Sequence, residues 1–483
     1  MELTLDISAL SSDGRGIARR PGQKTFFVSG ALPGEKVSAR PAAEHKTFCE
    51  AETVRILASA PHAVDPPCPH AGECGGCPLM RMDYAEQLVW KRRFVTDAVT
   101  RIAGLSDAPI GPIRPSPAVT ACRNRVELAF GLDGEGRVCL GMRRRGSHAV
   151  ISTPQCAMMP EKARAAVARL EQLARESRLT VYDGFRNERG PRRGGGPARP
   201  KTGFGFLRFC QIRSGRIPDD ASLASASSIP AAEGLWVVLL TSPGSTRERE
   251  RVRALASELL LDCPEVHAVI HEERRTADML VRGEKRLFAM GRPEYGLDPS
   301  LIVMPLNGMG YLVDAADFFQ VNTAAADVLC RTAMEKLETE DLIDLYCGAG
   351  APGLSIASRS VLGVEYSRSA VAAALRNARR FGTDGRYEAG DAAKVLSSPA
   401  FRTSDTEVVL CDPPRAGMTR PVIDYIRDRK PARMLYISCN PATLARDLGA
   451  LADCCTPTDI TPVDLFPHTP HVETVVLLSA VRK

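Results

Sequence analysis

The chain has 483 residues, of which 44% are hydrophobic and 25% are charged, and its formal net charge is +6. This composition excludes a disordered or fibrous protein, and the length predicts about three domains. No apolar run approaches the roughly 18 residues of a membrane span, and the first residues do not resemble a signal peptide. We therefore expect a cytoplasmic protein that does not associate with a membrane. Its mild positive charge is compatible with an anionic partner.

Short β-type runs open the chain, at residues 24–28 and 52–56, separated by the turn signals Asp13-Gly14 and Leu32-Pro33-Gly34. Small barrels built from such strands often bind oligonucleotides. The stretch DGRGIARRPGQKTFFVSGALPGEKVSAR resembles a TRAM domain, a small RNA-binding barrel found on RNA-modifying enzymes. That resemblance implies phosphate contacts from the basic side chains of Arg15, Arg19, Arg20 and Lys24.

A dense cysteine cluster follows in CPHAGECGGCPLM. The chain has fifteen cysteines, and in a cytoplasmic protein an odd number favours ligands or nucleophiles over a disulfide framework. Cys68, Cys74 and Cys77 can converge on one centre because Gly75 and Gly76 allow a tight backbone. Cys156, after a strand-like run and a turn, is the best candidate for a fourth ligand. We expect a 4Fe–4S cluster, with zinc as the alternative.

Residues 83–102 have the periodicity of an amphipathic helix, with an apolar side and a basic triplet, Lys91 to Arg93, expected to be exposed. The apolar side comprises Leu88, Phe94, Val95 and Val99. A strand is expected at 126–130, and three arginines at 143–145 follow a hairpin turn and are typical of a phosphate-contacting edge. The Gly- and Arg-rich stretch 188–205 is interpreted as a flexible basic loop.

The last third of the chain has the pattern of a nucleotide-cofactor site. An apolar strand at 342–346 leads into the glycine loop at 347–353, with Gly348 and Gly350, and then into a helical run. A second strand ends at Glu365, where an acid can accept hydrogen bonds from ribose hydroxyls. Gly390-Asp391 is placed to meet an adenine. Together the glycine loop, Glu365 and Gly390-Asp391 favour a Rossmann-like S-adenosylmethionine site, with NAD as the competing cofactor.

Two further strands end in candidate catalytic groups. Residues 408–411 lead into Asp412-Pro413-Pro414-Arg415. Residues 434–437 form an apolar strand that stops at Ser438, followed by Cys439 and a helical run. Ligands of open α/β sheets bind at the carboxyl ends of strands, and a helix N-terminus lowers the pKa of a nearby thiol. We therefore expect Cys439 to be a reactive thiol.

The stretches DLYCGAG, GVEYSRSAVAAALRNA, CDPPRAG, ISCNPATLARDL and TPHVETVVLL resemble the successive motifs of the RNA uridine C5-methyltransferase family. The TRAM-like start and the cysteine cluster resemble its iron–sulfur branch, which acts mainly on 23S ribosomal RNA. The resemblance covers nearly the whole chain. One departure is Ala351-Pro352, where the family usually has a small polar residue followed by an aromatic one.

The resemblance implies a role for each matching residue. Cys439 is implied as the nucleophile that adds to C6 of the uracil, and Glu473 as the base that removes the C5 proton. Asp412 is implied to lie where cofactor and base meet. The residues implied to hold S-adenosylmethionine are Gln320, Tyr346, Glu365 and Asp391.

We expect a multidomain α/β enzyme. Its predicted parts are an OB-like TRAM barrel at 1–60, a central α/β domain with the iron–sulfur cluster and an RNA-binding surface at 61–300, and a Rossmann-like methyltransferase domain at 301–483. The helix at 83–102 is a candidate to pack on the last of these. We expect the protein to be a monomer. Its expected partner is structured RNA, ribosomal rather than transfer RNA. The alternatives are the same chemistry on a transfer RNA, an amino-group methyltransferase, and a non-catalytic RNA-binding assembly factor.

Overall fold

The computed structural model describes residues 2–183, 205–292, 296–402 and 408–481. The chain divides into two compact units. The first unit comprises Met1–Gly72, Cys77–Val119 and Ala324–Lys483, and the second comprises Glu73–Gly76 and Thr120–Thr323. The division into three domains at 1–60, 61–300 and 301–483 stays a prediction. The Gly- and Arg-rich stretch falls almost wholly outside the described residues.

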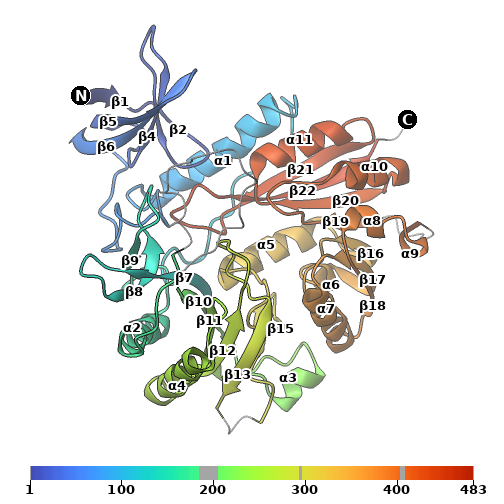
Figure 1. Cartoon of the computed structure of the whole chain (residues 1–483). Helices are drawn as coiled ribbons and strands as arrows, with labels where there is room; N and C mark the ends of the chain where they lie inside the picture. The colour runs from blue at the N-terminus through green and yellow to red at the C-terminus, as the bar shows by residue number, and fades with distance from the viewer. Residues whose placement is uncertain (1, 184–204, 293–295, 403–407, 482–483) are drawn as a thin grey trace, which may run out of the picture. The chain divides into compact units, whose positions relative to one another are not determined.

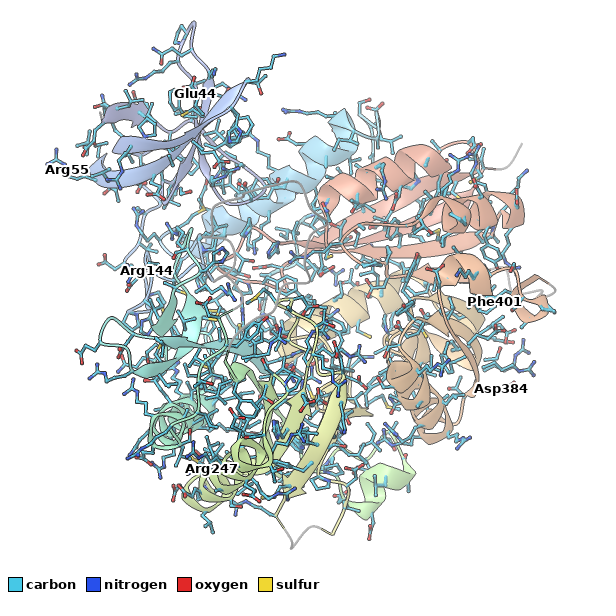
Figure 2. The ribbon with its side chains drawn as sticks, viewed as in Figure 1. Glu44, Arg55, Arg144, Arg247, Asp384 and Phe401 are labelled. Carbon is cyan, nitrogen blue, oxygen red and sulfur yellow. The ribbon has the colours of Figure 1, made fainter. Side chains whose placement is uncertain are left out.

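The first unit begins with a small sheet of strand order β1-β5-β6-β4-β3-β2 (Figure 1). Its inward residues alternate along the strands, and Phe26, Val28, Val37 and Ala39 form its core. Glu44 and Arg55, labelled in Figure 2, lie on its two longest strands. The strands are β1 (Leu3–Asp6), β2 (Ala9–Leu10), β3 (Gly16–Ala18), β4 (Thr25–Ser29), β5 (Lys36–Glu44) and β6 (Phe48–Ala58).

The same unit holds a larger sheet of order β18-β17-β16-β19-β20-β22-β21. All its strands are parallel except β22, which runs antiparallel to both neighbours. The strand order reverses at β16, which is where ligands bind in doubly wound sheets. The strands are β16 (Thr339–Leu345), β17 (Ala357–Glu365), β18 (Asp384–Ala389), β19 (Val408–Cys411), β20 (Arg433–Ser438), β21 (Cys455–Val463) and β22 (Glu473–Ala480).

Helices cover both faces of this sheet. Val95 and Val99 of α1 join Leu444 and Leu448 of α11 in its core cluster, so α1 packs on this sheet beside α11. Figure 1 shows α5, α6 and α7 on the opposite side from α10 and α11. The helices are α1 (Tyr84–Arg101), α5 (Thr323–Lys336), α6 (Gly353–Ile356), α7 (Arg368–Phe381), α8 (Ala392–Val395), α9 (Pro399–Arg402), α10 (Arg420–Arg429) and α11 (Pro441–Leu451).

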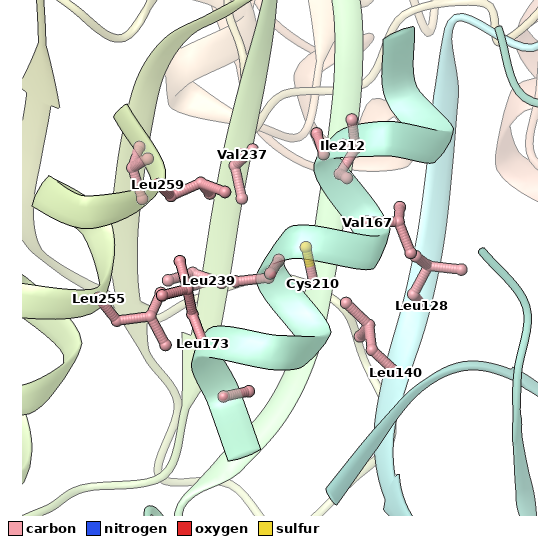
Figure 3. Packing of buried hydrophobic residues seen from close by; sticks show 14 of the residues in the cluster. Leu128, Leu140, Val167, Leu173, Cys210, Ile212, Val237, Leu239, Leu255 and Leu259 are labelled. Atoms are coloured by element: carbon pink, nitrogen blue, oxygen red, sulfur yellow. The ribbon is translucent and has the colours of Figure 1, made fainter. Parts of the chain in front are cut away.

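Most of the second unit is a sheet of order β13-β12-β11-β10-β7-β8-β9, on which β14 pairs with β10 and with β15. Figure 3 shows Val167 and Leu173 of α2 and Leu255 and Leu259 of α4 packed on one face of it. The strands are β7 (Arg125–Leu132), β8 (Val138–Arg143), β9 (Val150–Ser152), β10 (Leu207–Arg216), β11 (Glu233–Thr241), β12 (Val266–Glu273), β13 (Lys285–Gly291), β14 (Leu301–Leu306) and β15 (Met309–Asp314), and the helices are α2 (Glu161–Glu176), α3 (Asp220–Ala224) and α4 (Thr246–Asp262).

Two sequence expectations need correction. Lys91 is not exposed, because its side chain is fully buried at 0% relative accessibility and forms an ion pair with Asp464. The helical run after the glycine loop is a single turn, α6, because the chain enters β17 at Ala357. In the part of the chain that the structure describes, no helix is long and apolar enough to cross a membrane.

Candidate active site

The predicted nucleophile and the predicted base are brought together by strand pairing. In the antiparallel register of β20 and β22, Ser438 lies opposite Thr474. Cys439 follows Ser438 and Glu473 precedes Thr474, so both residues lie next to this last pair at the carboxyl end of β20, and the Glu473 carboxyl acts on the Cys439 thiol. Glu473 is the first residue of β22 and is only 5% exposed, whereas Cys439 is half-buried. Residues far apart in the sequence therefore meet at one edge of the sheet.

Asp412 belongs to the same edge. It follows β19, and its backbone N–H donates to the carbonyl of Leu345 at the end of β16 (3.2 Å). Burial raises the pKa of Asp412 to about 7. Since carboxylates repel one another, Asp412 also helps to raise the pKa of Glu473, which burial in the first place brings to about 8.

The thiol of Cys439 does not have the lowered pKa that the sequence predicts. Burial first, and then the carboxyl groups of Glu473 and Asp412, raise its pKa to about 11. Arg415 is the charged side chain that acts in the other direction, lowering the pKa of both Cys439 and Glu473.

The loop after β19 is fastened to α11. The side-chain amide of Asn440 and the hydroxyl of Thr443 donate to the carbonyl of Arg415 (3.1 and 3.2 Å). Asp447, which is fully buried, accepts hydrogen bonds from the Met418 N–H (2.8 Å) and the Tyr436 hydroxyl (2.7 Å). Asp447 therefore fixes the loop that carries Asp412, a role that the sequence reasoning missed because the residue lies within a helical run.

The glycine loop and Glu365 form a second part of the site. The Glu365 carboxylate accepts hydrogen bonds from the N–H groups of Gly348 (3.2 Å) and Ser367 (2.7 Å). Gly348 has a φ of +53° and open space where a Cβ would lie, so the loop backbone is accessible to a ligand. Tyr346, with a φ of +66°, leads into this loop from β16, and Asp391 caps α8 beyond the end of β18.

Asp344 is a further candidate that the sequence reasoning missed, because it lies inside an apolar strand. It is 1% exposed, and its Oδ2 atom has no hydrogen-bond partner among the described residues. Burial, followed by the charges of Asp412 and Glu365, raises its pKa well above the usual value. These three carboxyl groups lie close enough to influence one another, and a cationic ligand beside them would favour their charged forms.

S-Adenosylmethionine is a ligand of this charge, because it carries a positive sulfonium and an ammonium group. The pyrophosphate of NAD is anionic and would disfavour the charged forms of the same carboxyl groups. Gln320, the remaining residue implied to hold the cofactor, belongs to the second unit, where its carbonyl accepts a hydrogen bond from the Asn124 side chain (2.8 Å).

The predicted cluster ligands are divided between the units. Cys68 and Cys77 belong to the first unit, whereas Cys74 and Cys156 belong to the second. Across the described ranges, no group of three or more His, Cys, Asp or Glu side chains could hold a metal ion. The prediction of a 4Fe–4S cluster is therefore not confirmed.

Two of the four basic residues predicted to contact RNA phosphates form ion pairs within the first sheet. Arg15 pairs with Asp13 (2.7 Å) and Glu50 (3.1 Å), and Lys24 pairs with Glu44 (2.7 Å). These pairs are partly exposed and therefore weak, so an RNA phosphate can compete for the cations.

Comparisons with known proteins support the same interpretation. The tRNA (uracil-5-)-methyltransferase family matches residues 394–481, the TRAM domain matches residues 1–41, and the RNA cap guanine-N2 methyltransferase family matches residues 339–430. A Nitratidesulfovibrio vulgaris protein named as an RNA methyltransferase is 34% identical over 99% of this chain and 96% of its own length. A Bacillus cereus protein with the same name is 30% identical over 98% of this chain and 95% of its own length.

The tRNA (uracil-54, C5)-methyltransferase of Pyrococcus abyssi, solved with S-adenosyl-L-homocysteine, aligns with a TM-score of 0.72 and 24% identity. The alignment covers 99% of this chain and all of that chain. The fold is thus that of an S-adenosylmethionine-dependent methyltransferase with a TRAM domain. The chain belongs to the RNA methyltransferase family that its bacterial relatives represent, and its residues 394–481 match the tRNA (uracil-5-)-methyltransferase family.

Removing Glu365 tests the cofactor half of the site. Glu365→Ala is expected to weaken S-adenosylmethionine binding by about 1.5–3 kcal/mol, because a charged acceptor is lost. This corresponds to a roughly 10- to 150-fold higher Kd. Calorimetric titration measures the change, and RNA affinity should be unaltered. Glu340→Ala is the matched control. Glu340 is an exposed carboxylate near the start of β16, whereas the glycine loop follows the end of that strand. Equal losses in the two variants would contradict the assignment.

The charge of Arg415 should set the pH dependence of the reaction. Arg415 lowers the pKa of both Cys439 and Glu473, and in the roles predicted for them from the sequence both groups act without their proton. Arg415→Ala should therefore raise both pKa values and move the rising limb of the single-turnover rate to higher pH. Arg420→Ala, which removes an exposed arginine paired with Asp424, should leave the profile in place. A limb that stays fixed or moves to lower pH in Arg415→Ala would rule out this role.

Proposed function

We propose that the chain methylates C5 of a specific uridine in structured RNA through a covalent bond between Cys439 and C6 of the uracil. The observation that carries this proposal is the meeting of Cys439, Glu473 and Asp412 at the sheet edge that also bears the glycine loop. C5 of uracil is a weak nucleophile, but addition of a thiolate at C6 moves electron density onto C5. A thiol at this place therefore has a specific chemical task.

The residues act in sequence. The Cys439 thiolate adds to C6, which makes C5 nucleophilic; bound S-adenosylmethionine would supply the methyl group that C5 takes up and would leave as S-adenosylhomocysteine. Glu473, as a carboxylate, takes the proton from C5, and the electrons of that bond re-form the C5–C6 double bond while the Cys439 thiolate is expelled. The raised pKa of Glu473, about 8, makes it a stronger base than an ordinary carboxylate.

The target base must leave its stack before Cys439 can reach C6, so we propose that the uridine lies in a loop or is flipped into the site. The substrate that we propose is 23S ribosomal RNA, and the support for it is the resemblance of CPHAGECGGCP to the iron–sulfur branch of the family. Transfer RNA is the alternative outcome of the assay below.

The partial match to guanine-N2 methyltransferases raises a second function, methylation of an exocyclic amine. An amine attacks the methyl group with its own lone pair and needs no thiol. The match covers the glycine loop and Asp412 but ends before Cys439 and Glu473. Uridine methylation uses all of these residues, so it is the function that the site supports better.

The assay supplies the purified protein with methyl-labelled S-adenosylmethionine and with ribosomal or transfer RNA, and then separates the nucleosides. We expect the label in 5-methyluridine from 23S ribosomal RNA. Label in 5-methyluridine from transfer RNA would keep the chemistry and change the substrate. Label in N2-methylguanosine, or no transfer to either RNA, would refute the proposal.

We also propose that Cys68, Cys74, Cys77 and Cys156 hold a 4Fe–4S cluster, which is supported by their spacing in the sequence. Protein purified without oxygen is expected to be brown and to contain iron, whereas Cys156→Ser protein should lose the iron. Cys122→Ser is the matched control, because Cys122 is a similarly half-buried thiol of the same unit. Zinc in place of iron, or unchanged iron in Cys156→Ser, would end the proposal.

A further inference from the structure

Helix α1 has a buried polar side that faces the segment leading to Glu473. Gln87 and Lys91 are one helical turn apart, and both are 0% exposed. The Lys91 ammonium donates to Asp464 Oδ1 (2.6 Å) and to the carbonyl of Phe466 (2.9 Å). Asp464 directly follows β21, so Lys91 holds the start of the segment 464–472, which joins β21 to β22.

Gln87 holds the middle of the same segment. Its side-chain oxygen accepts the N–H of His468 (2.8 Å), and its amide nitrogen lies 3.2 Å from Nδ1 of the His468 ring. The amide also donates to the carbonyl of Met82 (2.8 Å), and the N–H of Leu79 donates to the carbonyl of His468 (2.9 Å). His468 is buried with a φ of +66°, so the backbone turns sharply at the point where α1 grips it.

Tyr84, at the start of α1, completes the contact. Its hydroxyl donates to Asp464 Oδ2 (2.8 Å) and accepts the N–H of Ser116 (2.8 Å). Asp464 also accepts the N–H of Phe466 (3.0 Å) through Oδ1. Both carboxylate oxygens of Asp464 are therefore bonded, and the buried charge is fully compensated.

The buried ion pair of Lys91 and Asp464 is not explained by folding stability alone. A buried ion pair loses hydration energy that apolar side chains of similar size would not lose, whereas it does fix one geometry. The geometry fixed here is the path of segment 464–472, whose next residue is Glu473. Figure 1 shows α1 beside α11, the helix that begins two residues after Cys439, so α1 packs on the same face of the sheet as α11.

We propose that Lys91 and Gln87 are positioning residues for the base: through segment 464–472 they set the place of the Glu473 carboxylate against C5 of the uridine. This inference rests on the proposed function. It predicts that loss of the hydrogen bonds from Lys91 or Gln87 to segment 464–472 slows proton removal at C5 and leaves the preceding steps unchanged. The defect should resemble a partial loss of Glu473.

The test compares Lys91→Met and Gln87→Met with the wild type in single-turnover reactions. Two rates are followed: transfer of labelled methyl to RNA, and release of methylated RNA from its covalent bond to Cys439. Release should slow by about 10- to 100-fold, the usual cost of a catalytic group misplaced by about 1 Å, while methyl transfer and the Kd for S-adenosylmethionine stay near the wild-type values. Methylated adduct should therefore accumulate in both variants.

Lys336→Met is the matched control, because Lys336, like Lys91, forms an ion pair with an aspartate. Its partner, Asp459, lies within β21 and not in segment 464–472. It should release RNA at the wild-type rate. Gln87→Met leaves no buried charge unpaired, so it carries the test if Lys91→Met does not fold.

The outcomes separate the inference from the proposed function. A wild type that forms no methylated adduct and no 5-methyluridine would refute the function itself. An active wild type with unchanged release in Gln87→Met and Lys91→Met would overturn the positioning role. Equal slowing of transfer and release would also overturn it, since that pattern indicates general damage to the site.

Discussion

Cys439→Ala protein is expected to bind S-adenosylmethionine normally and to transfer no methyl group to RNA. Without the thiol there is no addition at C6, so C5 never becomes nucleophilic enough to attack. We expect the single-turnover rate to fall by more than about 10³-fold, in keeping with the loss of a covalent nucleophile. Denaturing gels of the protein with labelled RNA should show no slow-migrating covalent species.

Cys454→Ala is a suitable control for this change. Cys454 is a buried thiol of the same unit, and its neighbour Cys455 pairs with Ala480 at the far end of β22 from Glu473. Its loss should leave methyl transfer unaffected. A Cys439→Ala protein that methylates RNA, or forms a covalent adduct, would exclude Cys439 as the nucleophile.

Glu473→Gln is expected to stop the reaction one stage later. Glutamine has nearly the shape of glutamate but cannot accept the C5 proton, so the thiolate cannot be expelled after methyl transfer. Methylated RNA should remain bonded to Cys439 and accumulate, and label from the methyl donor should migrate with it. Turnover should fall by about 10²- to 10⁴-fold, the usual contribution of a general base.

The pair of variants together tests the division of labour. The double variant Cys439→Ala/Glu473→Gln should form no adduct, because the bond to be trapped is never made. Near wild-type turnover in Glu473→Gln would show that another group removes the proton. An adduct that persists without the Cys439 thiol would place the covalent bond on a different residue.

The elements that carry these residues could be predicted from the sequence because each lies in a short, strongly patterned stretch. Residues 408–411 are the whole of β19, and the expected strand and helix around Cys439 are β20 and α11. The proximity of Cys439 and Glu473 has a different origin. It depends on β22 returning antiparallel beside β20, which local periodicity does not specify.

Two errors have a common physical cause. Lys91 was expected in solvent because a lysine on a helix usually is, yet its partner Asp464 lies 373 positions further along the chain. The pKa of Cys439 was expected to be low because a helix begins beside it, yet burial and the carboxyl groups of Glu473 and Asp412 dominate. In both cases the deciding groups come from remote segments, which no local pattern reveals.

If this chain makes 5-methyluridine in RNA, mapping of that nucleoside in cellular RNA will show it. RNA would be compared from cells with the gene, without it, and with the gene restored either as the wild type or as Cys439→Ala. We predict that one 5-methyluridine position is lost without the gene and returns only with the wild-type copy. A 5-methyluridine map that is the same in all four strains would contradict the account.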